Sequence, residues 1–175
     1  MRELVYSVAT SLDGFIAGPN GEYDWIVQDP AIDFGEIFRG FDTIVMGRLS
    51  YEAMLREGHS PREFGMKVLV ASSTLDPLRH SDVSIIAADL AGAIAQLKRQ
   101  SGKAIWLFGG GTIFRSLLDA GLVDRVEVSV IPILLGGGIP LVPAGKRWPL
   151  QFKDSRTFPS GIVSLTYGVA TLPKI

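Results

Sequence analysis

Three consecutive glycines, Gly109 to Gly111, separate a short apolar run from a segment with helical periodicity. The run before them, Lys103 to Phe108 (KAIWLF), is rich in strand-forming residues. Behind them, Ile113, Leu117 and Leu118 recur at helical spacing. The sequence therefore predicts a strand, a glycine turn and a helix.

A glycine turn at a helix start is suited to binding an anion. The first N–H groups of a helix have no partner within it, and the helix macrodipole places positive charge there. Glycine lets a phosphate approach closely, so Gly109, Gly110, Gly111 and the N–H of Thr112 could hold a pyrophosphate. The alternative is a tight connection in which glycine only supplies a positive φ angle. The run matches neither G-x-G-x-x-G nor a P-loop.

Strand-like runs alternate with helical patterns along most of the chain. This alternation implies parallel strands joined by crossovers, and nearly continuous apolar runs indicate a sheet covered on both faces. The last two runs flank Pro159-Ser160-Gly161, a hairpin signal that predicts an antiparallel edge. The expected strands are 4–10, 43–46, 67–71, 83–87, 104–108, 125–133, 150–158 and 162–170.

Four helices are expected between these strands. Asp29-Pro30 resembles an N-cap followed by proline at the first helical position, so the first helix is expected from there through Phe38. The others are expected at 50–57, from the cap Asp89 to before Gly102, and at 112–120. With 175 residues, 47% of them hydrophobic, the chain is expected to form one domain over residues 1–175.

Composition narrows the function classes. A net charge of −1, without a basic cluster, indicates a small-molecule partner rather than nucleic acid or an anionic membrane. The absence of cysteine excludes disulfides and thiol nucleophiles, and the two isolated histidines, His59 and His80, suggest no metal site. Without a signal-like N-terminus or a membrane-spanning run, a cytoplasmic protein is expected.

Two further loops carry groups that suit phosphates. In open α/β sheets, ligands bind beyond the carboxyl ends of the strands. Gly47, Arg48 and Ser50 follow one expected strand, and Ser72 and Ser73 follow the next. An arginine beside hydroxyls suits the 2′-phosphate of NADPH better than the ribose of NADH. The alternative is a surface ion pair for Arg48, with serines that only end a strand.

The loop after the first strand reads SLDGFIAGPNGEYDW. Asp13-Gly14 is a turn signal, and residues 18–21 form an adaptable stretch before Trp25. Its functional interpretation is a flap that excludes water from a nicotinamide. Its structural interpretation is a hairpin between two short strands, with Trp25 as a core aromatic residue. The later run LLGGGIPL predicts a turn at the cleft edge.

The motifs SLDGFIAG, TIVMGRLSYEAM, VLVASS and IWLFGGGTIFRSLLDAGLVDRVEVSVIPILLGGGIPLV resemble, in order and spacing, the dihydrofolate reductase-like superfamily. The resemblance is strongest to the reductase domain of riboflavin biosynthesis and its stand-alone relatives. It implies a three-layer α/β fold with a mixed, mostly parallel sheet of about eight strands, antiparallel C-terminal strands and helices on both faces. It also implies NADPH as cofactor and a homodimer.

The resemblance assigns roles by position. Arg48, Ser50, Ser72 and Ser73 would contact the cofactor's phosphates. Asp13 and Gly14 would line the nicotinamide and substrate cleft, with Asp13 as a candidate catalytic residue and Trp25 as a substrate contact. The pyrophosphate and nicotinamide wall would comprise Gly47, Phe108, Gly109, Gly110, Gly111, Thr112 and Ile113.

Asp33 is the candidate for the acidic residue that folate reductases carry on their first helix, where it binds substrate and helps deliver a proton. Glu36 would share its helix face, and the alternative is a carboxylate that only stabilises the helix start. For the ribose phosphate of riboflavin-type substrates, the sequence offers only Arg39 and Lys146.

The resemblance implies hydride transfer from NADPH to a pyrimidine- or pteridine-type substrate, most like 5-amino-6-(5-phosphoribosylamino)uracil reductase. The alternatives are a dihydrofolate reductase-type activity, a non-catalytic NADPH-binding module, and a protein that binds another phosphorylated ligand.

Overall fold

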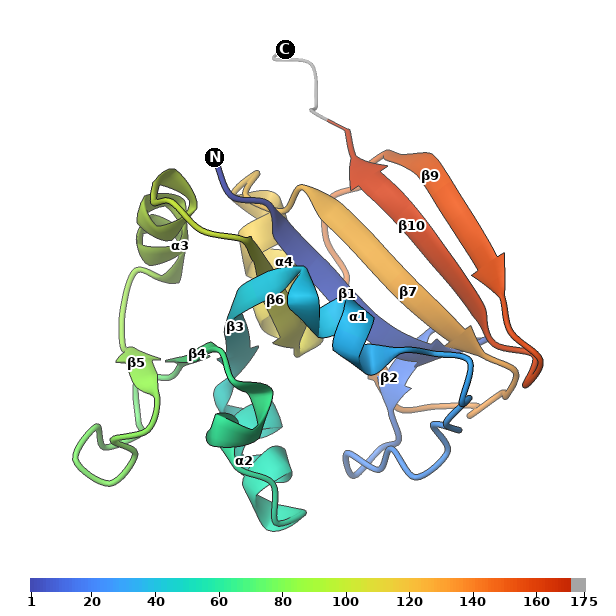
Figure 1. Cartoon of the computed structure of the whole chain (residues 1–175), viewed down its shortest axis with the longest axis horizontal. Coiled ribbons are helices and arrows are strands. Elements are labelled where there is room, and N and C mark those ends of the chain that lie inside the picture. Colours follow the sequence, from blue (N-terminus) through green and yellow to red (C-terminus); the bar gives the residue numbers. More distant parts are fainter. Residues whose placement is uncertain (171–175) are drawn as a thin grey trace.

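The structure is a computed structural model that describes residues 1–170; residues 171–175, which the single-domain expectation includes, lie outside the described part. Its centre is an eight-stranded sheet in the order β5-β4-β3-β6-β1-β7-β10-β9 (Figure 1). The strands from β5 to β7 in this order run parallel, and β10 pairs antiparallel with both β7 and β9. The mixed, mostly parallel sheet with antiparallel C-terminal strands is therefore confirmed. The strands are β1 Leu4–Ser11, β3 Phe41–Gly47, β4 Lys67–Ala71, β5 Ser84–Ile86, β6 Ala104–Gly109, β7 Arg125–Ile131, β9 Leu150–Thr157 and β10 Val163–Val169.

Helices cover both faces of the sheet, as expected. In Figure 1, α1 lies in front of the sheet and α4 behind it. A short 3₁₀ helix, η1, that the sequence patterns did not predict follows α2. In the described residues, no helix combines the length and apolar character needed to cross a lipid bilayer. The helices are α1 Phe34–Arg39, α2 Arg48–Arg56, η1 Pro61–Phe64, α3 Leu90–Arg99 and α4 Gly111–Asp119.

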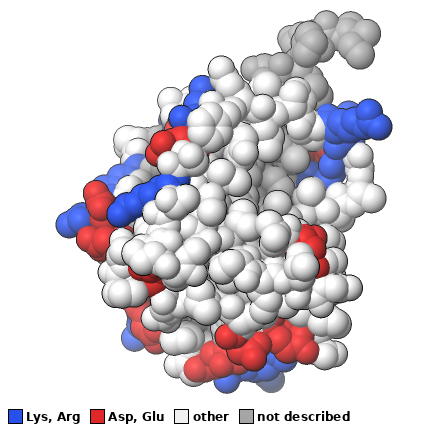
Figure 2. Space-filling view, turned by 90° about the vertical axis from the view of Figure 1, so that its right-hand side faces the viewer, with Lys and Arg blue, Asp and Glu red and all other residues white. Residues whose placement is uncertain are grey.

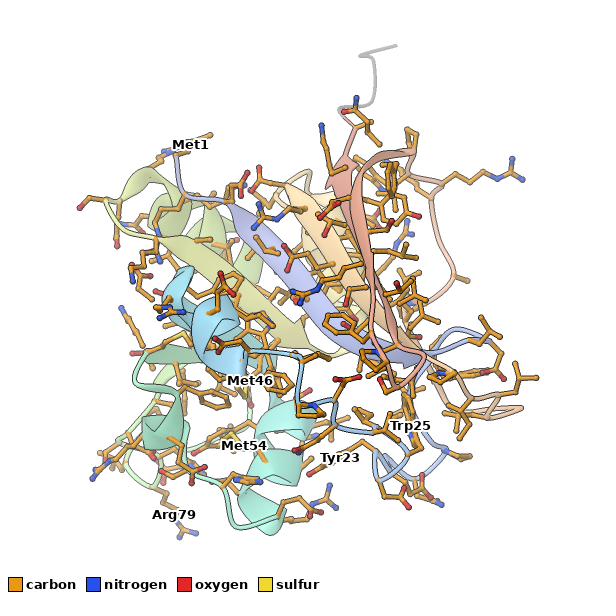
Figure 3. All side chains as sticks on the ribbon, turned by 45° about the vertical axis from the view of Figure 1, so that its right-hand side comes forward. Met1, Tyr23, Trp25, Met46, Met54 and Arg79 are labelled. Carbon is orange, nitrogen blue, oxygen red and sulfur yellow. The ribbon has the colours of Figure 1, made fainter. Side chains whose placement is uncertain are left out.

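Two apolar clusters join these layers to the sheet. On one face, side chains from α3 and α4 pack on alternate residues of the parallel strands, and the rings of Tyr6 and Phe114 stack with centroids 3.8 Å apart. On the other face, Trp106 lies among aromatic rings, including that of Phe38 from α1 at 5.3 Å. Met46 at the end of β3 and Met54 on α2 both belong to this second cluster (Figure 3). The period-2 pattern of the strands thus supplies both cores.

The predicted start of the first helix is wrong. Asp29-Pro30 does not open it; α1 begins at Phe34, with Asp33 as its N-cap. The reason is a long-range contact: the buried Asp29 carboxylate accepts hydrogen bonds from the N–H groups of Ala31 (2.8 Å) and Ser160 (2.9 Å). Asp29 therefore fastens the loop before α1 to the turn between β9 and β10.

Candidate cofactor site at the ends of the parallel strands

The four loops singled out in the sequence follow β4, β3, β6 and β1, which are neighbours in the sheet and run parallel. Their carboxyl ends therefore meet at one edge. The register of the central strands places Gly47 beside Ala71 and Met46 beside Gly109. The structure thus brings the Arg48 loop, the serine loop, the glycine turn and the Asp13 loop to the same edge of the sheet.

The helices α2 and α4 begin side by side at this edge. Their N-cap residues, Gly47 and Gly110, offer no side-chain hydrogen bond to the helix starts. A Cβ atom built on Gly47 would lie 3.6 Å from Ile113, which is ordinary contact distance. Cβ atoms built on Gly109 and Gly110 would lie 3.5 Å and 3.8 Å from Ser50 Oγ. The two helix starts therefore touch across the ends of β3 and β6, with the Ser50 hydroxyl between them.

The first N–H groups of α4 have no hydrogen-bond partner in the described residues, although Gly111 itself is buried. Among residues 1–170, no acceptor bonds the N–H groups of Gly111, Thr112 or Ile113, and Phe114 is the first to bond within the helix. Thr112 is exposed, and the peptide bond between Gly109 and Gly110 is cis. Two uncapped helix starts place their positive ends close together, an arrangement that suits a phosphate or pyrophosphate.

Arg48 has a partner within its own helix. Its Nη1 donates to both carboxylate oxygens of Glu52 at 2.9 Å, an exposed pair of the kind that the alternative interpretation foresaw. The same side chain also lines a groove of about 440 Å³ beyond the ends of β4 and β5. Within the described part of the chain, its Nε and Nη2 atoms donate to no acceptor. Arg48 therefore has donors left for an anion in the groove.

The groove extends the site beyond the residues identified from sequence. Ser72 and Ser73 line it, but Ser72 Oγ already accepts from the N–H groups of Thr74 and Leu75 in a local turn. Ser73 is exposed. The opposite wall comes from the loop between β5 and α3, which sequence analysis missed because the pairing of β5 with β4 is not a local signal. The lining residues are Arg48, Ala71, Ser72, Ser73, Thr74, Ile86, Ala87, Ala88, Asp89 and Leu90.

Phe108 lies on the aromatic face of β6. Its ring is 5.2 Å from that of Trp106 and 6.0 Å from that of Phe64. The Trp106 indole donates to the Ser7 carbonyl oxygen of β1. Trp106 and Phe108 thus connect the glycine turn to the packed layer under α1. The Trp106 indole belongs to a residue only a few positions before the turn at which a ligand would bind.

The Asp13 side chain connects its own loop to the second glycine run, Gly136 to Gly138. Its carboxylate accepts from Ser11 Oγ (2.6 Å) and from the N–H groups of Leu135 (3.1 Å) and Gly136 (2.7 Å). The Ser11 hydrogen bond is the main cause that holds the Asp13 pKa below its usual value, followed by the two backbone hydrogen bonds. Gly14 follows with φ of 87°, and its carbonyl accepts from Leu141 N–H. Asp13 is therefore ionised at neutral pH.

The flap does not form the hairpin that the structural alternative described. Its strand β2 (Phe15–Ala17) instead pairs with β8 (Ile139–Pro140) from the second glycine run. Trp25 lies outside the buried core, and its Nε1 donates to Glu22 O at 3.0 Å within the loop. Figure 3 shows Tyr23 and Trp25 below the sheet edge, at the end of the molecule where α2 and Met54 lie. The flap therefore stands beside the edge where the four loops meet.

Asp33 caps α1. Its Oδ1 accepts from Glu36 N–H at 2.9 Å, and its Oδ2 lies 3.9 Å from Arg39. The side chain is 64% exposed. These contacts match the structural alternative for this residue; the second oxygen faces Arg39 without a hydrogen bond, and the catalytic role stays a prediction.

Comparison with known proteins identifies relatives over the whole fold. The family model described as the RibD C-terminal domain matches residues 2–164. The uncharacterized protein YyaP of Bacillus subtilis (strain 168) is 33% identical over 178 residues, covering 95% of this chain and 94% of YyaP. A crystal structure of a candidate riboflavin biosynthesis protein from Shewanella sp. PV-4 superposes with a TM-score of 0.82 at 28% identity, covering 98% of this chain and 100% of that one.

Two longer proteins match this chain over part of their own length. The riboflavin biosynthesis protein RibD of Corynebacterium ammoniagenes is 27% identical over 77% of this chain, which spans 44% of that protein. The deaminase/5-amino-6-(5-phosphoribosylamino)uracil reductase of Thermotoga maritima superposes with a TM-score of 0.69 at 16% identity, and 57% of it is covered. At 16% identity, the likeness to the Thermotoga protein concerns the fold alone.

Proposed function

The chain belongs to the RibD C-terminal domain family, and from this premise we propose that it is an NADPH-dependent oxidoreductase. In the proposed reaction, a hydride passes from NADPH to a pyrimidine- or pteridine-type ring or to an imine attached to it. The reductase named for the Thermotoga relative acts on such a compound, 5-amino-6-(5-phosphoribosylamino)uracil. The chemistry of that relative is the model for this chain.

One observation carries the proposal: the uncapped starts of α2 and α4 meet at Ser50, next to a groove lined by Arg48. A dinucleotide phosphate needs backbone donors for its pyrophosphate and a charge-assisted donor for its 2′-phosphate. The residues present fit both needs. The N–H groups of Gly111 to Ile113 would hold the pyrophosphate, and Arg48 with Ser73 would hold the 2′-phosphate.

This assignment fixes the direction of the cofactor along the sheet edge. With the 2′-phosphate at the β4 and β5 groove and the pyrophosphate at α4, the nicotinamide extends toward β1 and the flap. When bound, NADPH supplies the hydride. The chain's own part is to hold the rings in reactive orientation and, through the flap, to exclude water.

The two candidate acids differ in what they can do. Asp13, whose pKa is held low by its hydrogen bonds, stays ionised and is suited to fixing the cleft wall rather than to donating a proton. Asp33 is exposed and has one oxygen without a hydrogen bond to the helix, so it or solvent delivers the proton in our proposal.

Binding and turnover test the proposal separately. Trp106 lies two residues before the glycine turn, so NADPH is expected to quench tryptophan fluorescence more strongly than NADH or ATP. Loss of NADPH absorbance with a panel of aminouracils, dihydrofolate and dihydropterins then measures catalysis. Reduction of dihydrofolate alone would favour the folate alternative. NADPH binding without turnover of any compound would favour a non-catalytic module, and stronger quenching by ATP would favour another phosphorylated ligand.

The homodimer and the cytoplasmic location remain proposals. The edge strand β9 offers a surface for a second copy, because all eight of its residues are exposed, including Leu150 and Phe152. Light scattering of the purified chain measures its mass in solution.

A further inference from the structure

Charge is distributed unevenly along the chain. The whole sequence has 17 basic and 18 acidic residues, yet between Arg2 and Arg39 there are seven acidic residues and no Lys, Arg or His. From Val126 to Gly145 the one charged residue is Glu127. These two segments contain the flap and the second glycine run.

The fold places both segments on one side of the proposed cofactor site. Leu12 N–H donates to Ile133 O at 2.8 Å, and Leu141 N–H donates to Gly14 O at 2.9 Å, so the segments are joined along β2 and β8. A Cβ atom on Gly111 would lie 2.9 Å from Pro140 O. The joined segments therefore form the wall beside the start of α4, on the β1 side, away from the Arg48 groove.

The carboxylates of this wall are ionised at neutral pH. Hydrogen bonds from Ser11 to Asp13 and from Asn20 to Glu22 hold both carboxyl pKa values below their usual range. Figure 2, which faces the β9 side of the molecule, shows acidic side chains along its lower rim, with basic side chains beside and below them, and uncharged residues over most of its centre.

Three cations near this wall are offset by an acid or covered by an aromatic ring. Arg39 lies 3.9 Å from Asp33. Arg156 lies over the Phe158 ring at 4.7 Å and contributes to the low pKa of Asp29. Arg56 makes no ion pair within residues 1–170, but the charge of the neighbouring Glu57 opposes its effect on the Tyr23 hydroxyl.

The nearest helix start gives no help to an anion either. The N-terminus of α1 is capped by the Asp33 carboxylate, and Glu36 lies in its first turn. By contrast, apolar and aromatic surface is available there: Tyr23 is 40% exposed and Phe34 49%. Such surface suits the faces of a heterocyclic ring.

We propose that the substrate of this chain carries no phosphate and is a neutral or cationic nitrogen heterocycle or imine. The inference rests on the proposed function, because it concerns the substrate side of the same site. It separates this chain from the Thermotoga relative, whose named substrate bears a ribose phosphate. A phosphate brought to this wall would face ionised carboxylates that outnumber the nearby cations Arg39, Arg56 and Arg156, while Arg48 serves the cofactor.

The test uses matched substrates. The kcat/KM of the full chain with saturating NADPH is measured at low salt for 5-amino-6-(5-phosphoribosylamino)uracil and for the same compound without its phosphate. A dihydropterin with and without a side-chain phosphate forms a second pair. We expect kcat/KM to be about tenfold higher for the unphosphorylated member of each pair. The ratio of the two kcat/KM values should decrease when added salt screens the charges of the wall.

Charge variants show whether the wall causes the preference. Asp24 is exposed between Tyr23 and Trp25, so Asp24→Lys is expected to reduce the ratio about threefold. Asp154→Lys on β9, three strands from β1, is the matched control and should leave the ratio unchanged. Equal kcat/KM within a pair, or a higher value for the phosphorylated member, overturns the inference while the reductase proposal stands. If the protein oxidises NADPH with none of the four compounds and binds none of them, both this inference and the reductase proposal are rejected.

Discussion

Ser50 Oγ lies 3.5 Å from the position that a Cβ atom would take on Gly109, and 3.8 Å from that on Gly110. A hydroxyl of α2 therefore lies directly against the turn that opens α4. Each distance is ordinary van der Waals contact, so side chains at these two glycines would fit the protein itself. Gly109 is buried and Gly110 is partly exposed, so the proposed pyrophosphate would approach the turn at Gly110.

Gly110→Ala should separate folding from binding. The new methyl group has room within the protein, so the free energy of unfolding is expected to change by less than about 1 kcal/mol. The affinity for NADPH should fall about tenfold, because the methyl group stands between the helix start and the phosphates. Urea unfolding and fluorescence titration measure the two effects. Unchanged NADPH affinity would contradict the site.

Gly111→Ala should behave in the opposite way. A Cβ atom there would lie 2.9 Å from Pro140 O and 3.2 Å from Pro143, so backbone must move to admit it. We expect unfolding to become easier by about 1–3 kcal/mol. Urea unfolding of both glycine variants side by side gives the comparison, and equal stabilities would refute the packing of β8 on α4.

Arg48→Ala should weaken NADPH binding about tenfold and NADH binding much less, because one charge-assisted contact is lost. Its ion pair with Glu52 is exposed and contributes only about 0.5 kcal/mol to folding. The control, Glu52→Gln, breaks the same pair but keeps the guanidinium, so it should bind NADPH at least as tightly as the wild type. Calorimetric titration with both cofactors distinguishes the cases, and equal losses for NADPH and NADH would remove Arg48 from the 2′-phosphate site.

Asp124→Ala should destabilise the fold from the far end of the sheet. Lys98 is 5% exposed and donates to Asp124 and to Leu122 O, and Leu4 N–H donates to the same carboxylate at 2.7 Å. Removing the acid leaves a buried ammonium without its counter-charge, at a cost of about 2–4 kcal/mol. Chemical denaturation measures it, with the exposed Asp154→Ala as control. A loss no larger than that of the control would show that the pair is dispensable.

Asp29 should make stability fall in acid. Hydrogen bonds from the Ser160 side chain and from the N–H groups of Ala31 and Ser160 hold its folded-state pKa below the value in the unfolded chain. Its contribution is therefore complete above about pH 5 and is lost as the pH falls below about 4. Asp29→Asn cannot titrate, so its melting temperature should vary less than that of the wild type between about pH 6 and about pH 3. If the melting temperatures of the two proteins fall equally over this pH range, the prediction is wrong.

The parts of the site that follow parallel strands could be predicted from sequence, because strand ends and glycine-led helix starts are local signals. The expected helix at 112–120 is α4, which begins one residue earlier. Likewise, Arg48 and Ser50 lie in the first turn of α2, and Ser50 contacts the glycine turn.

The remainder depends on contacts between residues distant in sequence. Asp29 and Asp33 carry equivalent capping signals, and the hydrogen bond from Ser160, 131 residues away, decides between them. In the same way, the bonds from Leu135 and Gly136 to Asp13 and the pairing of β2 with β8 join segments more than a hundred residues apart. Local periodicity and turn chemistry carry no information about such partners.

The central claim is that the starts of α2 and α4 hold the phosphates of NADPH, and a crystal structure of the chain soaked with NADPH tests it most directly. The account predicts the pyrophosphate within hydrogen-bond distance of the N–H groups of Gly111, Thr112 or Ile113, and the 2′-phosphate beside Arg48. A dinucleotide bound elsewhere on the protein, or bound with its phosphates turned away from both helix starts, would contradict it.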